Sequence, residues 1–136
     1  MRVRASSLNY RDLMVLKGGG RGPTKLGVVP LSDGAEVAAI GEGVTRVKLG
    51  DRVIGTFHPR WLGGPLSADY LTDRLGANLD GMLAKHAVLS EEALVHVPSH
   101  LFFEEAATLP CVADLLYVAV DFDERGLARQ ESRCTE

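Results

Sequence analysis

The stretch GEGVTRVKLGDRVIGTF, residues 41–57, decides the fold of this chain. Gly41-Glu42-Gly43 and Gly50-Asp51 are turn signals, because glycine accepts the backbone angles of tight turns. Residues 45–49 alternate polar and apolar side chains, and residues 52–57 are rich in β-branched side chains. Both patterns are typical of extended backbone. The stretch therefore predicts extended segments divided by turns, with the firmest strand at 52–57.

Further short elements are predicted on both sides of this stretch. Strands are expected at residues 2–5, 35–40, 82–89 and 94–97, and short helices at 9–16, 67–75 and 102–107. Glycine and proline clusters at 18–23 and 63–65 predict loops. Many short strands spaced by turns are typical of a small β-barrel-like domain. We expect a mainly β domain with short helices, built as a partly open barrel.

The size and composition of the chain limit the kinds of partner and the cellular location that we expect. Its 136 residues suggest one domain, and 46% hydrophobic residues are enough to bury a core. The formal net charge of -3 gives no electrostatic reason to expect nucleic acid or an anionic membrane as a partner. No window approaches the roughly 20 apolar residues of a membrane-spanning helix, and the N-terminus lacks an apolar signal core. We expect a cytoplasmic protein.

Two common kinds of site are disfavoured by residue spacing. The glycine runs at 18–23 and 41–46 begin G-x-G, but neither completes the G-x-G-x-x-G that cradles a pyrophosphate. The potential metal ligands form no favourable short pair and are scattered at His58, His86, His96, His100, Cys111 and Cys134. We interpret the histidines as surface or loop residues and Cys111 as a buried small hydrophobe.

One polar cluster lies at a predicted strand-to-helix junction, residues 6–12. Asn9, Tyr10 and Asp12 bring an amide, a phenol and a carboxylate close together in sequence. These groups could line a pocket, or they could cap the helix that follows. An Asn followed three residues later by Asp resembles a capping arrangement, so the residue types alone favour capping.

Three runs of sequence, taken in order, carry a resemblance to a known family. They are VRASSLNYRDLMVLKG (3–18), LSDGAEVAAIGEGVTRVKLGDRVIGTF (31–57) and LAKHAVLSEEALVHVPSHLFFEEAATLPC (83–111). The chain resembles the medium-chain dehydrogenase/reductase superfamily, and within it the quinone oxidoreductase-like, zinc-independent homologues of alcohol dehydrogenase. The segments at 41–53 and 104–110 are the most specific.

The resemblance implies a fold, an activity and a site. The fold is a GroES-like β-barrel over residues 1–111, and the activity is NAD(P)H-dependent hydride transfer to or from a small-molecule carbonyl, quinone or alkene. Asn9 matches the asparagine that quinone oxidoreductases keep near the nicotinamide and the substrate. Tyr10 and Asp12 follow as pocket lining and local support. Zinc-binding relatives have Cys at the position of Asn9 and His at that of Ser32, so no catalytic zinc is expected.

The chain also departs from the family pattern. The first strands of the barrel and the Rossmann domain are expected to be missing, and residues 112–136 to form a divergent, poorly ordered tail. One glycine is deleted between Ala35 and Glu36, which would swap the faces of a strand unless a bulge absorbs it. We expect a catalytic-domain fragment that is inactive alone, so its status as an enzyme stays open. The alternatives are a stand-alone GroES-like interaction module, self-associating through exposed strand edges, and a non-functional gene remnant.

Overall fold

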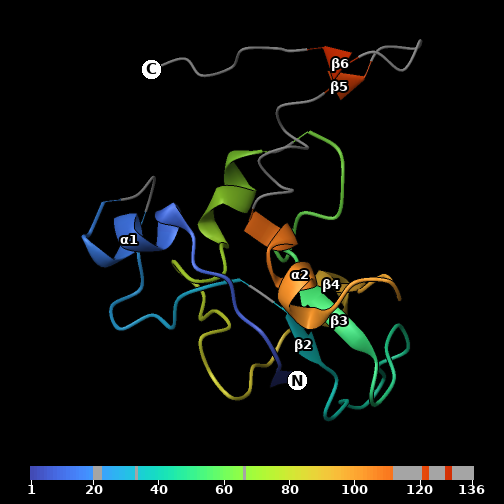
Figure 1. Ribbon diagram of the computed structural model, residues 1–136. Coiled ribbons are helices and arrows are strands. Elements are labelled where there is room, and N and C mark those ends of the chain that lie inside the picture. The colour runs from blue at the N-terminus through green and yellow to red at the C-terminus, as the bar shows by residue number, and fades with distance from the viewer. Residues whose placement is uncertain (20–22, 33, 66, 112–120, 123–127, 130–136) are drawn as a thin grey trace.

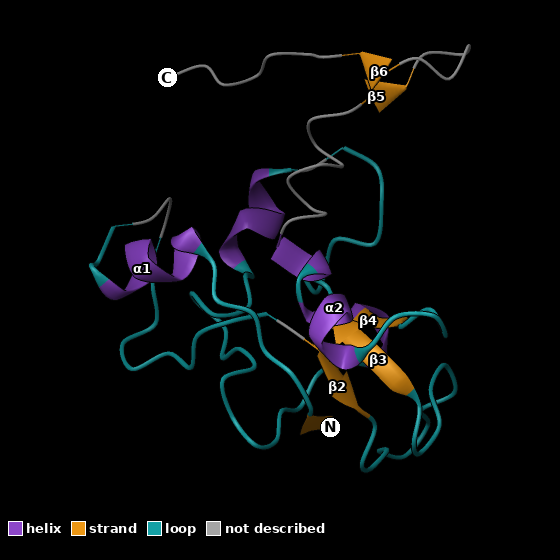
Figure 2. Ribbon diagram, viewed as in Figure 1, coloured by secondary structure: helices purple, strands orange, loops and turns teal. Residues whose placement is uncertain are grey.

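The computed structural model describes residues 1–19, 23–32, 34–65, 67–111, 121–122 and 128–129 (Figure 1). Its centre is a four-stranded antiparallel sheet in the order β1-β2-β3-β4 (Figure 2). The strands are β1 (Arg2–Val3), β2 (Gly34–Glu36), β3 (Arg52–Gly55) and β4 (Leu94–His96). The prediction of a mainly β domain with short helices and an open sheet is therefore confirmed.

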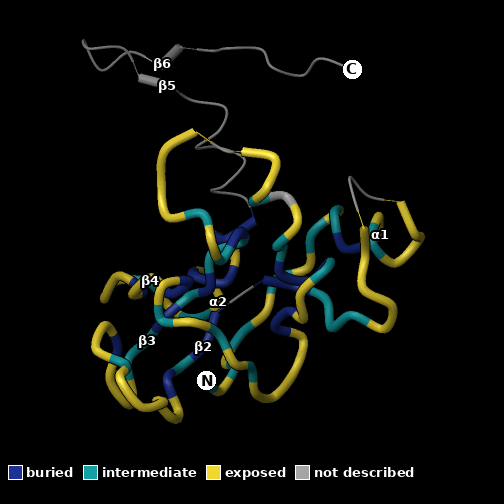
Figure 3. Tube along the Cα trace, turned by 180° about the vertical axis from the view of Figure 1, so that it is seen from behind, coloured by how far each residue is buried: buried dark blue, intermediate teal, exposed yellow. Residues whose placement is uncertain are grey.

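The core includes this sheet, where residues of β2 and β3 are among the buried ones (Figure 3). Val53 of β3 is fully buried and pairs in register with Ala35 of β2 and His96 of β4. Val53 packs in one apolar cluster with Val37, Val47 and Leu94. Four buried side chains from separate segments hold the sheet together, because their removal from water is the main favourable term in folding.

The pairing of β2 is continuous across the predicted glycine deletion. Ala35 pairs with Val53, and Glu36 pairs with Arg52, with no extra residue between them. Ala35 and Val37 are buried while Glu36 is half-buried, so the side chains alternate as in an ordinary strand. The strand ends at Glu36 rather than at Ile40 as predicted. Residues 38–40 are exposed and have no partner strand among the described residues.

Residues 109–111 are helical, and four further short helices lie around the sheet in the part of the chain that the structure describes. They are α1 (Tyr10–Leu16), the 3-10 helices η1 (Ala68–Thr72) and η2 (Glu91–Ala93), and α2 (Phe103–Ala107). α2 packs on β2: a side chain at Gly34 would lie 3.7 Å from the Phe103 carbonyl and 3.8 Å from the Ala107 nitrogen. α1 stands to one side of the sheet in both views (Figures 1 and 3). Its position therefore depends on contacts other than packing on the sheet face.

The predicted strand at 82–89 is wrong. Met82 and Leu83 donate backbone hydrogen bonds to the carbonyls of Leu31 and Pro30, at 3.0 Å each. Further along, His86 forms an isolated bridge with Arg2. The segment divides its bonds between two partners, so no regular ladder forms. The sequence could not reveal that division, because a run of largely apolar residues does not show which segments it will pair with.

The predicted tail, residues 112–136, lies outside the described residues except for two short strands. β5 (Asp121–Phe122) pairs antiparallel with β6 (Ala128–Arg129). The expectation of poor order over the rest of this segment stays a prediction.

The described helices are all short, and α1 has seven residues. None of the helices in the described part of the chain has the length and apolar character of a membrane-spanning segment. The cytoplasmic location stays a prediction.

Candidate functional site

The candidate site is built around the first turn of α1, where Asn9 is the N-cap residue. The Asn9 backbone N–H donates a 2.9 Å hydrogen bond to Asp12 Oδ2, and the Asp12 N–H donates to the Asn9 carbonyl at 3.0 Å. The capping relation predicted between these two residues is therefore present. Helix N-termini leave backbone N–H groups without intrahelical partners, so a carboxylate three residues into the turn stabilises the start of the helix.

The side chains of the three predicted site residues have different surroundings. Asp12 is 5% exposed, Asn9 is half-buried and Tyr10 is 77% exposed. The Asn9 amide donates one hydrogen bond to the Ser7 carbonyl at 3.3 Å. Asp12 is used by the cap, whereas the Tyr10 ring is open to solvent. The roles of Asn9 and Tyr10 toward a ligand stay predictions.

Arg11 joins this turn to the end of β3 and was not singled out from the sequence. Its guanidinium donates to Asp12 Oδ1 at 3.3 Å and to the carbonyl of the buried Leu75. The guanidinium carbon also lies 4.3 Å from the centre of the Phe57 ring. A planar cation over an aromatic face is attractive and adds to the two hydrogen bonds. Asn9 is thereby connected, through Asp12 and Arg11, to Phe57.

The segment after β3 forms a compact aromatic group. The rings of Phe57 and His58 are 4.7 Å apart and nearly perpendicular, and Trp61 lies 6.4 Å from His58. His58 Nδ1 lies 3.0 Å from the Tyr70 carbonyl, and the residue is only 7% exposed. Of the two places expected for the histidines, surface or loop, His58 has the loop, and within that loop it is buried. Its burial follows from the aromatic neighbours, which the spacing of histidines alone could not indicate.

A strained turn lies just before Ser32. The family resemblance places Ser32 where zinc-binding relatives have a ligating histidine. Leu31 has φ of 71°, a left-handed conformation that costs a leucine energy, and Ser32 is 1% exposed. Two glycines pack directly against this turn. A side chain at Gly76 would lie 2.7 Å from the Leu31 nitrogen, and one at Gly81 would lie 1.9 Å from the Leu31 carbonyl oxygen.

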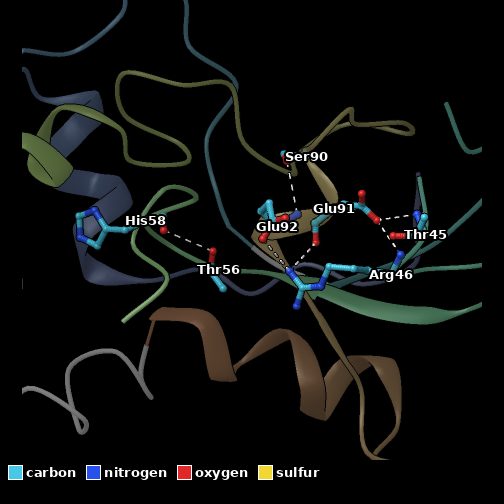
Figure 4. A network of polar contacts seen from close by, with 7 residues as sticks. All are labelled: Thr45, Arg46, Thr56, His58, Ser90, Glu91 and Glu92. Carbon is cyan, nitrogen blue, oxygen red and sulfur yellow. Dashed lines mark hydrogen bonds and ion pairs between the residues drawn. The ribbon is translucent and has the colours of Figure 1, made fainter. Parts of the chain in front are cut away.

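A separate polar network ties the turn after residue 43 to η2 (Figure 4). The Glu91 carboxylate accepts backbone hydrogen bonds from Thr45 at 2.8 Å and Arg46 at 2.6 Å. The Arg46 backbone N–H, followed by that of Thr45, holds the pKa of Glu91 below its usual value. The Arg46 guanidinium in turn reaches Glu92 at 3.1 Å. These groups bind one another, so we infer that the network stabilises the contact between this turn and η2.

Metal ligands do not gather in the described part of the chain. No group of three or more His, Cys, Asp or Glu side chains there could hold an ion. His96, one of the scattered candidates, has its Nε2 atom 3.1 Å from Asp51 Oδ2, which accepts the hydrogen bond. Cys111 is buried, as predicted. A pocket of about 290 Å³ is lined mainly by apolar residues such as Val37 and Leu94, together with Glu91, and does not include Asn9.

Comparison with known proteins places this geometry in a family. The model of the alcohol dehydrogenase GroES-like domain matches residues 1–99. The zinc-type alcohol dehydrogenase-like protein of Schizosaccharomyces pombe is 46% identical over 115 residues, which are 83% of this chain and 33% of that protein. The acryloyl-coenzyme A reductase of Metallosphaera sedula is 34% identical over 145 residues, covering 98% of this chain and 40% of that protein.

A solved structure agrees with these relatives. The crystal structure of a putative alcohol dehydrogenase from Sinorhizobium meliloti 1021 superposes with a TM-score of 0.72 at 42% identity, covering 80% of this chain and 33% of that chain. The chain thus spans between a third and two fifths of the length of these three relatives. It belongs to the alcohol dehydrogenase GroES-like domain family, in the medium-chain dehydrogenase/reductase superfamily of oxidoreductases.

Proposed function

We propose that this chain is the catalytic-domain part of an NAD(P)H-dependent oxidoreductase that transfers hydride to or from a carbonyl, quinone or alkene without a metal. Its family membership and the names of its relatives support an oxidoreductase. The observation that carries the proposal is the half-buried Asn9 amide at the N-cap of α1, beside the exposed Tyr10 ring. We assign the small molecule to this side of α1.

In this proposal Asn9 orients the reactants by hydrogen bonding. An amide offers two N–H donors and an acceptor oxygen, and the bond to the Ser7 carbonyl accounts for one donor. The amide is therefore suited to a substrate oxygen or to the carboxamide of the nicotinamide. When bound, the nicotinamide supplies or accepts the hydride, and the chain contributes orientation. Asp12 supports the site indirectly, because its carboxylate is committed to the cap.

The residues at the two positions where zinc-binding relatives carry ligands do not suit zinc. Zinc prefers thiolate and imidazole ligands, and Asn9 and Ser32 offer an amide and a hydroxyl. The S. pombe relative is named a zinc-type protein, so the zinc-independent assignment concerns this chain's own residues. No step of the proposed reaction depends on a metal.

We further propose that the chain alone does not turn over. Neither glycine run completes a pyrophosphate-binding loop, so the dinucleotide has only its nicotinamide end to place against Asn9 and Tyr10. Mixed with NADPH and a quinone, the purified chain is expected to oxidise no more NADPH than a heat-treated control. Turnover above that control would contradict this part of the proposal.

The Asn9 assignment is tested by NMR with reduced nicotinamide mononucleotide, which carries the nicotinamide half of the cofactor. We expect the Asn9 side-chain amide signal to shift as the mononucleotide is added. The matched control is Asn78, whose side-chain oxygen accepts a 2.7 Å hydrogen bond from the Arg74 backbone. Its signal is expected to stay in place. Shifts that leave Asn9 unmoved, or move both amides alike, would overturn the assignment.

A second candidate function, an interaction module, is favoured by the exposed apolar side chains near α1. Leu13, Leu16 and Leu26 are 52%, 72% and 99% exposed, respectively. Such groups commonly mark surfaces that contact another protein. Concentration-dependent association in light scattering, without any nicotinamide response at Asn9, would favour this function. A chain that shows no cooperative melt would instead favour the non-functional remnant.

A further inference from the structure

Arg11 occupies a bridging position between the two halves of the candidate site. One half is the first turn of α1, which carries Asn9, and the other is the aromatic segment that begins at Phe57. α1 stands apart from the sheet (Figure 1), so its placement depends on specific contacts. We call the contacts that Arg11 makes with Asp12, Leu75 and Phe57 the Arg11 tie. The Arg11 side chain is 19% exposed and reaches across 64 residues of sequence to the Leu75 carbonyl.

The far end of this tie is rigid. Leu75 is fully buried, and its backbone N–H donates a 3.1 Å hydrogen bond to the Phe57 carbonyl. Arg11 bonds the Leu75 carbonyl and stacks on the Phe57 ring, 4.3 Å from its centre. The guanidinium thus meets two groups that are already bonded to each other. Its position is fixed relative to the end of β3.

The near end of the tie reaches Asn9 through one carboxylate. Asp12 Oδ1 accepts from Arg11 at 3.3 Å, and Asp12 Oδ2 accepts from the Asn9 backbone N–H at 2.9 Å. Asp12 is 5% exposed, so its charge needs both partners. Any shift of the Arg11 guanidinium would move this carboxylate and, with it, the residue that begins the helix.

We propose that Arg11 is a positioning residue. It fixes the place of Asn9 relative to the aromatic segment that begins at Phe57. The importance of Asn9 in this inference rests on the proposed function. The contacts of Arg11 with Asp12, Leu75 and Phe57 do not. Only arginine meets all three partners at once, because its planar fork donates in two directions while its face stacks on the ring. A lysine ammonium is a point charge that can serve Asp12 or Leu75, without the stacking.

The chain contains a matched control in Arg52. Its guanidinium donates to the Leu101 carbonyl and lies 4.7 Å from the centre of the Phe103 ring. Arg52 therefore makes the same kinds of contact as Arg11 at a different place. Replacing it removes comparable contacts without touching Asp12 or Asn9.

The experiment compares Arg11→Gln, Arg11→Lys and Arg52→Gln by amide hydrogen exchange and by thermal melting. We expect the exchange rate of the Asn9 N–H, corrected for any loss of global stability, to rise about tenfold in Arg11→Gln, the scale of one hydrogen bond to a charged group. Arg11→Lys is expected to show a smaller rise. In Arg52→Gln the corrected rate should stay at the wild-type value.

Two results would overturn the inference. One is an equal corrected Asn9 rate in Arg11→Gln and Arg52→Gln. The other, decisive if Arg11→Gln does not fold, is an Arg11→Lys protein whose Asn9 exchange matches the wild type. Neither readout involves nicotinamide or turnover. A failed mononucleotide titration with a positive exchange result would therefore reject the function of Asn9 while leaving the role of Arg11 intact.

Discussion

Replacement of Gly81 by alanine tests the strained turn beside Ser32 most directly. The added Cβ would lie 1.9 Å from the Leu31 carbonyl oxygen and 2.6 Å from that of Pro30. Both obstacles are backbone atoms, so no side-chain rotation can relieve the clash. The Gly81 N–H also donates a 2.6 Å hydrogen bond to the Val29 carbonyl, which keeps the two segments close.

The expected cost follows from these contacts. Overpacking that shifts backbone costs roughly 1–3 kcal/mol. The shift would also strain the hydrogen bonds that Gly81 and Met82 donate to Val29 and Leu31, each worth about 1 kcal/mol. We therefore expect the free energy of unfolding to fall by about 3 kcal/mol. For a chain of this size that lowers Tm by about 10 °C.

The assay is urea unfolding followed by the fluorescence of Trp61, the single tryptophan. The matched control is Gly41→Ala, because a Cβ at Gly41 would meet nothing nearer than 4.0 Å. The control is expected to change the free energy of unfolding by less than about 1 kcal/mol. If the two variants are equally stable, the turn at Leu31 does not pack against Gly81.

Three further perturbations have defined outcomes. Asp12→Asn removes a buried carboxylate that serves the cap and Arg11, and should lower the free energy of unfolding by about 1–3 kcal/mol in urea titrations. Glu91 has a lowered pKa in the folded chain, so it adds stability above its unfolded pKa and loses that contribution as pH falls through the folded value. Melts from about pH 5 to 3 should therefore fall more steeply for the wild type than for Glu91→Gln; equal slopes would contradict the assignment. Met82→Ala, at a fully buried side chain, should cost about 2–5 kcal/mol, whereas Val88→Ala, at one 96% exposed, should cost under about 0.5 kcal/mol by the same measurement.

Local patterns predicted the elements whose signals are contained in neighbouring residues. The β-branched run at 52–57 contains β3, and the Asn9–Asp12 spacing identified the start of α1. Both elements depend on backbone angles and on hydrogen bonds between residues a few positions apart. The local order of residue types therefore indicates them directly. The predicted strand at 82–89 failed because its backbone hydrogen bonds go to two different segments of the chain and form no regular ladder.

The candidate site shows the same division. Asn9, Tyr10 and Asp12 could be proposed from the order of residues and the family resemblance. The aromatic segment could not, because His58 is buried by ring contacts and Arg11 reaches a carbonyl 64 residues away. The identity of a histidine or an arginine in the sequence does not show whether its side chain will face solvent or contact a distant residue.

By itself, the sequence determined the family, the mainly β fold class and the capped turn that carries Asn9. These follow from short-range preferences and from motifs that lie intact in one run of residues. The tertiary structure alone decided that Arg11 joins Asp12 to Phe57 and Leu75, and that Gly81 packs on the Leu31 turn. Such contacts join segments far apart in the chain, and they exist only once burial of the core has brought those segments together.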